Sequence, residues 1–151
     1  LYDKNASASA NTVTPVFDTT GHIFNVFIPY QDKADLVYSL NAGDVHYVVN
    51  AKGIKGVSVP SKLYGVMSAG KPVFGILEEG SEARLIIEES GCGLSVTPGD
   101  YEAIEELTKR FIELRDTDEL RTMGKAGREY LVNNLTKEVS IEKYRDEIKS
   151  C

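Results

Sequence analysis

The chain has 151 residues, a length that predicts one compact domain with a sizeable core. Hydrophobic residues make up 42% and charged residues 26% of it, the balance of an ordinary globular protein. A net charge of −6 disfavours non-specific nucleic-acid binding and an anionic membrane surface, because both need a cationic face. No apolar stretch approaches the roughly 20 residues that span a bilayer, and no signal segment opens the chain.

Two cysteines, Cys92 and Cys151, do not make a disulfide framework, so we expect a reducing, cytoplasmic setting. The chain begins with Leu1 rather than Met, which predicts a processed protein or a fragment of a larger one. We expect residues 1–22 to be poorly ordered or atypical, since the run 5–14 is small and polar. The domain itself is expected over residues 23–151.

From Phe24 onward, short β-rich runs alternate with helical patterns. Strands are predicted at 24–29, 44–49, 72–77 and 93–96. Helices are predicted at 33–41, 60–69 and 82–89, from residue 100 onward, around 120–131 and after 136. Pro60 fits the first turn of its helix, and Gly70 fits the position just past its end. In the run after residue 100, one face carries Ile104, Leu107, Phe111 and Leu114.

Strands that alternate with helices predict an α/β fold, with a Rossmann-like parallel sheet flanked by helices and with C-terminal helices after it. Such sheets bind ligands beyond the carboxyl ends of their strands. This rule selects three loops for a site: the loop after Pro29, the loop 51–60 and the loop 77–82.

The most informative stretch runs from Gly56 to Gly65, with the sequence GVSVPSKLYG. A glycine-containing loop leads there into a helix N-terminus, which favours anions through free N–H groups and the helix dipole. Lys62 adds a full charge, and Ser58 or Ser61 can donate to a phosphate oxygen. The alternative is a capped helix with a solvated lysine.

Several segments together resemble the family 4 retaining glycosyltransferases of the GT-B fold, in the branch that builds colanic acid, O-antigen and capsule. The segments are NVFIPY at 25–30, AGDV at 42–45, AGKPV at 69–73, the loop 78–82 and GLSVTPGD at 93–100. The resemblance covers about residues 25–144 and implies the C-terminal, donor-binding domain of such an enzyme. It implies a nucleotide diphospho-sugar as partner, a UDP-sugar in particular, and no cofactor.

Carried over by position, the resemblance implies the donor-binding residues. Tyr30, with Ile28, is placed near the base, unless Tyr30 is simply a rim aromatic. Gly56, Val57 and Ser58 are placed near the sugar and pyrophosphate, and Ser61 and Lys62 near the phosphates. Glu82 is placed near the donor, or is only a favourable acid in the first turn of a helix.

One departure from the family concerns its pair of glutamates, of which the second holds the ribose. The matching positions here are Val57 and Gly65, and neither carries a carboxylate. Either this branch holds the ribose differently or donor binding is degraded, and we favour the first. The cations that neutralise the leaving diphosphate are expected in segments that precede this chain. The acceptor-side residues are expected in the N-terminal acceptor domain, which this chain lacks. We therefore expect the isolated chain to be inactive.

Other classes fit less well. No Gly-x-Gly-x-x-Gly stands between a first strand and helix, and no Gly-x-Ser-x-Gly elbow is present, which disfavours a dehydrogenase and a hydrolase. His22 and His46 stand alone, so no metal site is predicted. The remaining alternative is a non-catalytic interaction or nucleotide-binding module of the same fold, with the helices in 102–149 as partner surface.

Overall fold

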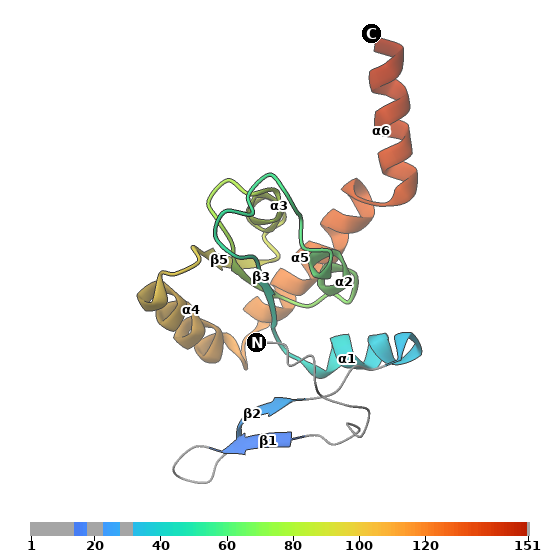
Figure 1. Ribbon diagram of the computed structural model, residues 1–151. Coiled ribbons are helices and arrows are strands. Elements are labelled where there is room, and N and C mark those ends of the chain that lie inside the picture. Colours follow the sequence, from blue (N-terminus) through green and yellow to red (C-terminus); the bar gives the residue numbers. More distant parts are fainter. Residues whose placement is uncertain (1–13, 18–22, 28–31, 151) are drawn as a thin grey trace. The chain divides into compact units, whose positions relative to one another are not determined.

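A computed structural model describes residues 14–17, 23–27 and 32–150. The chain divides into two units, Leu1–Leu36 and Val37–Cys151, and each is described by itself. In the first unit, β1 (Thr14–Phe17) pairs antiparallel with β2 (Ile23–Phe27), and a short 3₁₀ helix, η1 (Lys33–Asp35), follows (Figure 1).

The pairing of β2 corrects one sequence expectation. The strand predicted at 24–29 is present as Ile23–Phe27, but it belongs to a two-stranded antiparallel sheet rather than to the parallel sheet. The β-rich run Thr14–Phe17 lies close by in sequence, and a hairpin between near segments closes a short loop at low entropic cost. Residues 28–31, which include Tyr30, lie outside the described part of the chain.

The second unit alternates helices and strands and confirms the α/β prediction. Its elements are α1 (Leu36–Ala42), β3 (His46–Val49), α2 (Lys62–Ser68), β4 (Val73–Ile76), α3 (Glu82–Ser90), β5 (Gly93–Val96), α4 (Tyr101–Leu114), α5 (Asp118–Asn134) and α6 (Lys137–Ser150). The three strands form a parallel sheet in the order β3-β4-β5. The sheet is thus Rossmann-like, flanked by helices and followed by C-terminal helices, as the sequence predicts.

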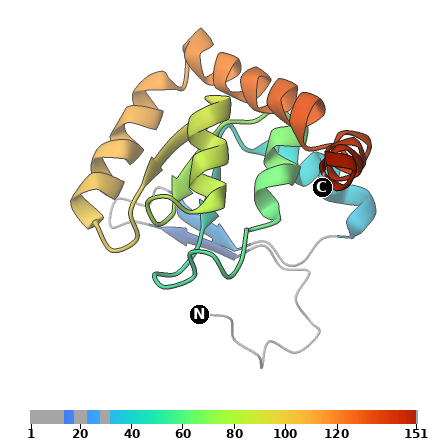
Figure 2. The ribbon, with the colours of Figure 1, turned by 90° about the horizontal axis from the view of Figure 1, so that it is seen from above.

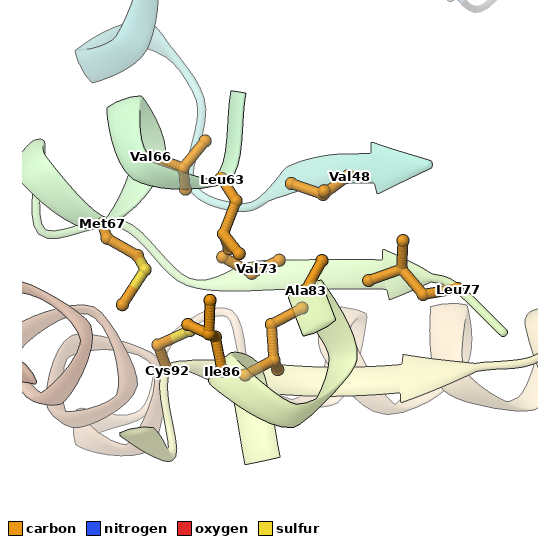
Figure 3. Packing of buried hydrophobic residues seen from close by; sticks show 10 residues of the cluster. Val48, Leu63, Val66, Met67, Val73, Leu77, Ala83, Ile86 and Cys92 are labelled. Carbon is orange, nitrogen blue, oxygen red and sulfur yellow. The ribbon is translucent and has the colours of Figure 1, made fainter. Parts of the chain in front are cut away.

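One face of the sheet carries α2 and α3 side by side (Figure 2). Side chains alternate along β4 and into the residue after it, so Val73 and Leu77 point to this face and are fully buried. They meet Val48 of β3, Leu63 of α2 and Ile87 of α3 in the larger cluster of buried residues, most of which Figure 3 shows. The period-2 pattern of the strand and the apolar stripes of both helices therefore close one core.

The opposite face of the sheet is covered by α4 and by the start of α5 (Figure 1). Phe74, the β4 residue between Val73 and Gly75, stacks on Phe111 of α4 with ring centroids 5.3 Å apart. Leu114 and Leu120 complete this second cluster of buried residues. The helical face predicted from Ile104 to Leu114 is thereby confirmed.

Helix α5 approaches the backbone of the segment before β4 very closely. A Cβ built on Gly124 would lie 2.0 Å from the carbonyl oxygen of Gly70, and one on Gly127 would lie 2.6 Å from Cβ of Cys92. Only glycine permits this approach, since any side chain at Gly124 would overlap main-chain atoms. In the same region the Arg128 guanidinium donates to the carbonyl of Ser68 at 2.7 Å.

The helices predicted from residue 100 and after 136 both begin at a side-chain cap. The Asp100 carboxylate accepts from the Ala103 amide at 3.0 Å, and the Thr136 hydroxyl accepts from the Val139 amide at 3.3 Å. The helix predicted at 60–69 is shorter, because α2 begins at Lys62 and Pro60 lies in the turn before it. No helix in the described ranges is long and apolar enough to cross a membrane.

Candidate functional site at the carboxyl ends of the strands

All three strands of the parallel sheet run in one direction, so the loops that follow them gather at one edge. The loop after β3 covers residues 50–61, the loop after β4 covers 77–81, and the loop after β5 covers 97–100. Of the predicted site residues in the described ranges, Lys62 opens α2 and Glu82 opens α3. The others lie in the loop after β3: Gly56, Val57, Ser58 and Ser61.

The Glu78 carboxylate joins the first two loops. Its Oε2 accepts from the amides of Gly53 and Lys55, each at 3.0 Å. These two bonds favour the ionised carboxylate and hold the pKa of Glu78 below its ordinary value of 4.5. The Lys55 ammonium in turn donates to the carbonyl of Glu79 at 2.8 Å. The two loops are therefore held together by three bonds that cross between them.

The loop after β3 is also bonded to itself. The Asn50 amide group donates to the carbonyl of Ser58 at 3.2 Å, and the Val57 amide donates to the carbonyl of Ile54 at 3.0 Å. Gly56 has a φ of 77°, in the left-handed region where a side chain is strained. These bonds present Gly56, Val57 and Ser58 to solvent at the outer end of the loop, where the Val57 side chain is 78% exposed.

Ser61 and Lys62 stand where this loop enters α2, and both are exposed. Ser61 adopts helical dihedral angles and its hydroxyl makes no capping bond to α2. Because α2 has only seven residues, its dipole is weaker than that of the longer helix expected from the sequence. The charge of Lys62 is thus the main cationic feature at this entrance.

The loop after β4 ends at the head of α3, a helix of nine residues. Ser81 is 8% exposed, and its hydroxyl oxygen has no hydrogen-bond partner among the residues that the structure describes. Its backbone is extended, and the side chain does not cap the helix. Glu82 follows it, exposed in the first turn. The head of α3 therefore presents a buried hydroxyl beside an exposed carboxylate.

Arg84 ties the second loop to the third. Its guanidinium donates to the carbonyl of Leu77 at 3.4 Å and to the hydroxyl of Thr97 at 3.3 Å, and it pairs with Glu88 at 2.8 Å. These three partners hold the Arg84 guanidinium in place between the two loops. Arg84 therefore links the loop after β4 to the loop after β5.

The structure thus brings the predicted residues 56–58, 61 and 62 into one loop and its exit, and it joins this loop to the one that precedes Glu82. Sequence reasoning did not assign Glu78, Asn50 or Ser81. The sequence did carry one signal for Glu78: it is a carboxylate placed directly after a predicted apolar strand, where ligand-binding loops begin.

Histidine and metal chemistry add nothing further at this edge. The His46 ring nitrogen Nε2 lies 2.8 Å from the carbonyl oxygen of Leu40, so the ring ties α1 to β3. Within the described ranges, no three His, Cys, Asp or Glu side chains come together as a metal site.

The fold and the joined loops define a Rossmann-like α/β domain with a candidate ligand site at the carboxyl edge of its sheet. The chain is 35% identical, over 111 residues, to a protein of Pseudomonas aeruginosa named probable glycosyltransferase WbjE. The match covers 74% of this chain and 27% of that relative. No family model matches the chain, and no solved structure gives a significant match.

Proposed function

We propose that the chain is the donor-binding part of a GT-B glycosyltransferase of family 4 and takes a nucleotide diphospho-sugar at the carboxyl edge of the β3-β4-β5 sheet. The observation that carries the proposal is the similarity to a probable glycosyltransferase over 74% of the chain. The joined loops support it, because a ligand site at this edge of a parallel sheet needs loops held in a fixed arrangement.

In the proposed complex, the diphosphate lies between the entrance of α2 and the head of α3. Lys62 supplies a charge, and Ser58 and Ser61 donate to phosphate oxygens. The buried hydroxyl of Ser81, which lacks a partner among the described residues, gains one from the same ligand. Positive potential at this point stabilises the charge that develops on the leaving diphosphate.

The sugar lies against the outer end of the β3–α2 loop in this proposal, near Gly56 and Val57. The space beside Gly56 is open, since a Cβ built there meets no atom within 4 Å. Glu82 approaches the donor from the head of α3, and Tyr30 contacts the base. The ribose is held without the family's glutamate pair, since Val57 and Gly65 occupy those positions.

The finer assignment follows the family resemblance. The donor is a UDP-sugar, transferred with retention of configuration to a glycan or lipid-linked acceptor in the synthesis of a surface polysaccharide. The chain spans 27% of its relative, so the acceptor domain and the upstream cations are proposed to lie in the rest of the protein. The 151-residue chain alone binds donor without transferring sugar.

Calorimetric titration with UDP tests the role of Lys62. Lys62→Ala should weaken UDP binding by about tenfold, the equivalent of roughly 1.4 kcal/mol for one charge-assisted contact. The midpoint of thermal unfolding should stay unchanged, because the Lys62 side chain is exposed. Lys137→Ala, which removes an exposed lysine at the start of α6, is the matched control and should bind UDP like the unaltered chain.

Equal affinity of Lys62→Ala and the unaltered chain would remove Lys62 from the site. A thermal-shift screen of UDP, GDP and ADP and of their sugars tests the proposal as a whole. A response to none of these nucleotides in the intact protein would contradict donor binding and favour the interaction module. Local pairs such as Lys109 with Glu105 in α4, at 2.6 Å, are also what a solvated helix face contains.

A further inference from the structure

The proposed function does not assign a role to Glu78, although this residue fixes the middle of the loop after β3. Its Oε2 accepts from the amides of Gly53 and Lys55, each at 3.0 Å, on either side of Ile54. Ile54 is partly buried, whereas the other residues in 51–59 are exposed. The Glu78 carboxylate therefore anchors the loop around Ile54.

The peptide unit between Ile54 and Lys55 carries this constraint to the outer end of the loop. A trans peptide unit is planar, so its carbonyl and its amide point in opposite directions from one rigid group. Because the Lys55 amide is held on Glu78, the Ile54 carbonyl is directed to the opposite side. There it accepts from the amide of Val57 at 3.0 Å and from the amide of Ser58 at 3.4 Å. A continuous chain of bonds thus leads from Glu78 to Ser58.

Little else in the described ranges holds the outer end of this loop. The amide group of Asn50 donates to the Ser58 carbonyl at 3.2 Å. Gly53 and Gly56 have φ values of 88° and 77°, and glycine loses more freedom than any other residue when it adopts one conformation. Bonds to an ionised acceptor are about twice as strong as bonds between neutral groups, and the lowered pKa of Glu78 keeps it ionised. The two bonds that Glu78 accepts therefore contribute a large part of the order in this loop.

We propose that Glu78 is a positioning residue of the donor site, which acts through Ile54 to hold residues 56–58 in the conformation that contacts the sugar and the pyrophosphate. This role rests on the proposed function, because it requires the donor to lie against residues 56–58. Its effect is on the population of binding-competent molecules. When only a fraction of the molecules has the loop in that conformation, the apparent dissociation constant rises by the inverse of the fraction.

Amide hydrogen exchange in the intact protein, the complete product of the gene that encodes these residues, tests the chain of bonds without any donor. Glu78→Ala leaves the anchoring amides without their acceptor. We expect the amides of Val57 and Ser58, which Glu78 does not contact, to exchange roughly tenfold faster. Glu79→Ala is the matched control, since Glu79 is exposed and contributes only its main-chain carbonyl to the bonds between the loops. Unchanged exchange at Val57 and Ser58 in Glu78→Ala overturns the proposal, whether or not a donor binds.

Calorimetric titration of the same intact variants with UDP tests the consequence for binding. If Glu78→Ala leaves the loop competent in about one molecule in ten, it binds UDP about tenfold more weakly. Glu78→Gln should lie between Glu78→Ala and the unaltered protein, because its neutral oxygen can accept the same bonds about half as strongly. Glu79→Ala should bind like the unaltered protein, and all unfolding midpoints should agree.

The outcomes separate this role from the proposed function. Equal UDP affinity in Glu78→Ala and the unaltered protein overturns the positioning role. The same holds for a loss of affinity that comes with a lowered unfolding midpoint or that Glu79→Ala shares, since either result makes the effect general rather than specific to the loop. If exchange responds as expected and the unaltered protein binds none of UDP, GDP and ADP, the proposed function fails, and the positioning role fails with it, while the chain of bonds stands.

Discussion

Replacing Gly124 with alanine should destabilise the protein, although alanine is the better helix former. Gly124 lies in the interior of α5, where glycine costs about 1 kcal/mol relative to alanine. A Cβ there would lie 2.0 Å from the carbonyl oxygen of Gly70 and 3.3 Å from Cα of Lys71. Because these are main-chain atoms, no side-chain rotation relieves the overlap and α5 has to move away.

The size of the effect follows from two opposing terms. Overpacking of a filled interface costs about 1–3 kcal/mol, and a clash with backbone belongs at the upper end of that range. The gain in helix propensity offsets about 1 kcal/mol of it. The net loss is about 2 kcal/mol, which lowers the unfolding midpoint of a chain of this size by roughly 4–8 °C.

Gly65→Ala is the matched control, since it makes the same change inside another helix. A Cβ on Gly65 of α2 would meet only Cδ1 of Leu40, at 3.8 Å, which is an ordinary contact. Gly65→Ala should therefore raise the midpoint by a few degrees through the propensity term of about 1 kcal/mol. Scanning calorimetry of both variants should show a lower unfolding midpoint for Gly124→Ala and a higher one for Gly65→Ala. A midpoint that rises in Gly124→Ala as it does in Gly65→Ala would refute the close approach of α5 to Gly70.

Two further predictions concern the hydrogen bonds that Glu78 accepts at the site and the second cluster of buried residues, around Phe74 and Phe111. The amide protons of Gly53 and Lys55 should titrate in NMR with a midpoint below 4.5, because their bonds to Glu78 persist until that carboxylate protonates. Because its pKa is depressed, ionised Glu78 stabilises the loops fully at a pH above its ordinary pKa, and this stabilisation is lost as the pH falls through the lowered pKa. Glu78→Gln should abolish the titration. In the 151-residue chain, Phe111→Ala should cost about 3–5 kcal/mol in denaturant unfolding, because Phe111 is 6% exposed and stacks on Phe74. The neighbouring Ile112→Ala, at a position 67% exposed, should change stability little; equal losses would contradict the assigned helix face.

The fold of the second unit was largely predictable, because its signals are local and periodic. The apolar spacing from Ile104 to Leu114 fixes the buried face of α4, and Asp100 marks its start through the capping bond. Alternation of strands and helices then implies the parallel sheet. The first unit differs because β-rich composition at 23–27 does not specify a partner. Whether that run joins a parallel sheet or a hairpin depends on pairing energies outside it.

The site was predictable as a location but not as a set of contacts. The rule for carboxyl ends of strands selects the loops after β3 and β4 without any structure. The bond from Gly53 to Glu78 spans 25 residues, and no spacing in the sequence indicates it. Likewise the start of α2 depends on the turn that holds Pro60 to Leu63, so the sequence placed the helix two residues too early.

The two ends of the sheet have separate physical roles, and this separation makes the functional tests interpretable. At the amino end, Gly124 and Arg128 of α5 contact the backbone of the segment before β4, and buried apolar contacts lie behind them. At the carboxyl end, the loops are exposed and joined chiefly by polar bonds of Glu78 and Lys55. Exposed hydrogen-bonded loops contribute little to global stability compared with a buried core. A variant at the carboxyl end that changes ligand affinity and leaves the unfolding midpoint in place therefore reports on the site itself.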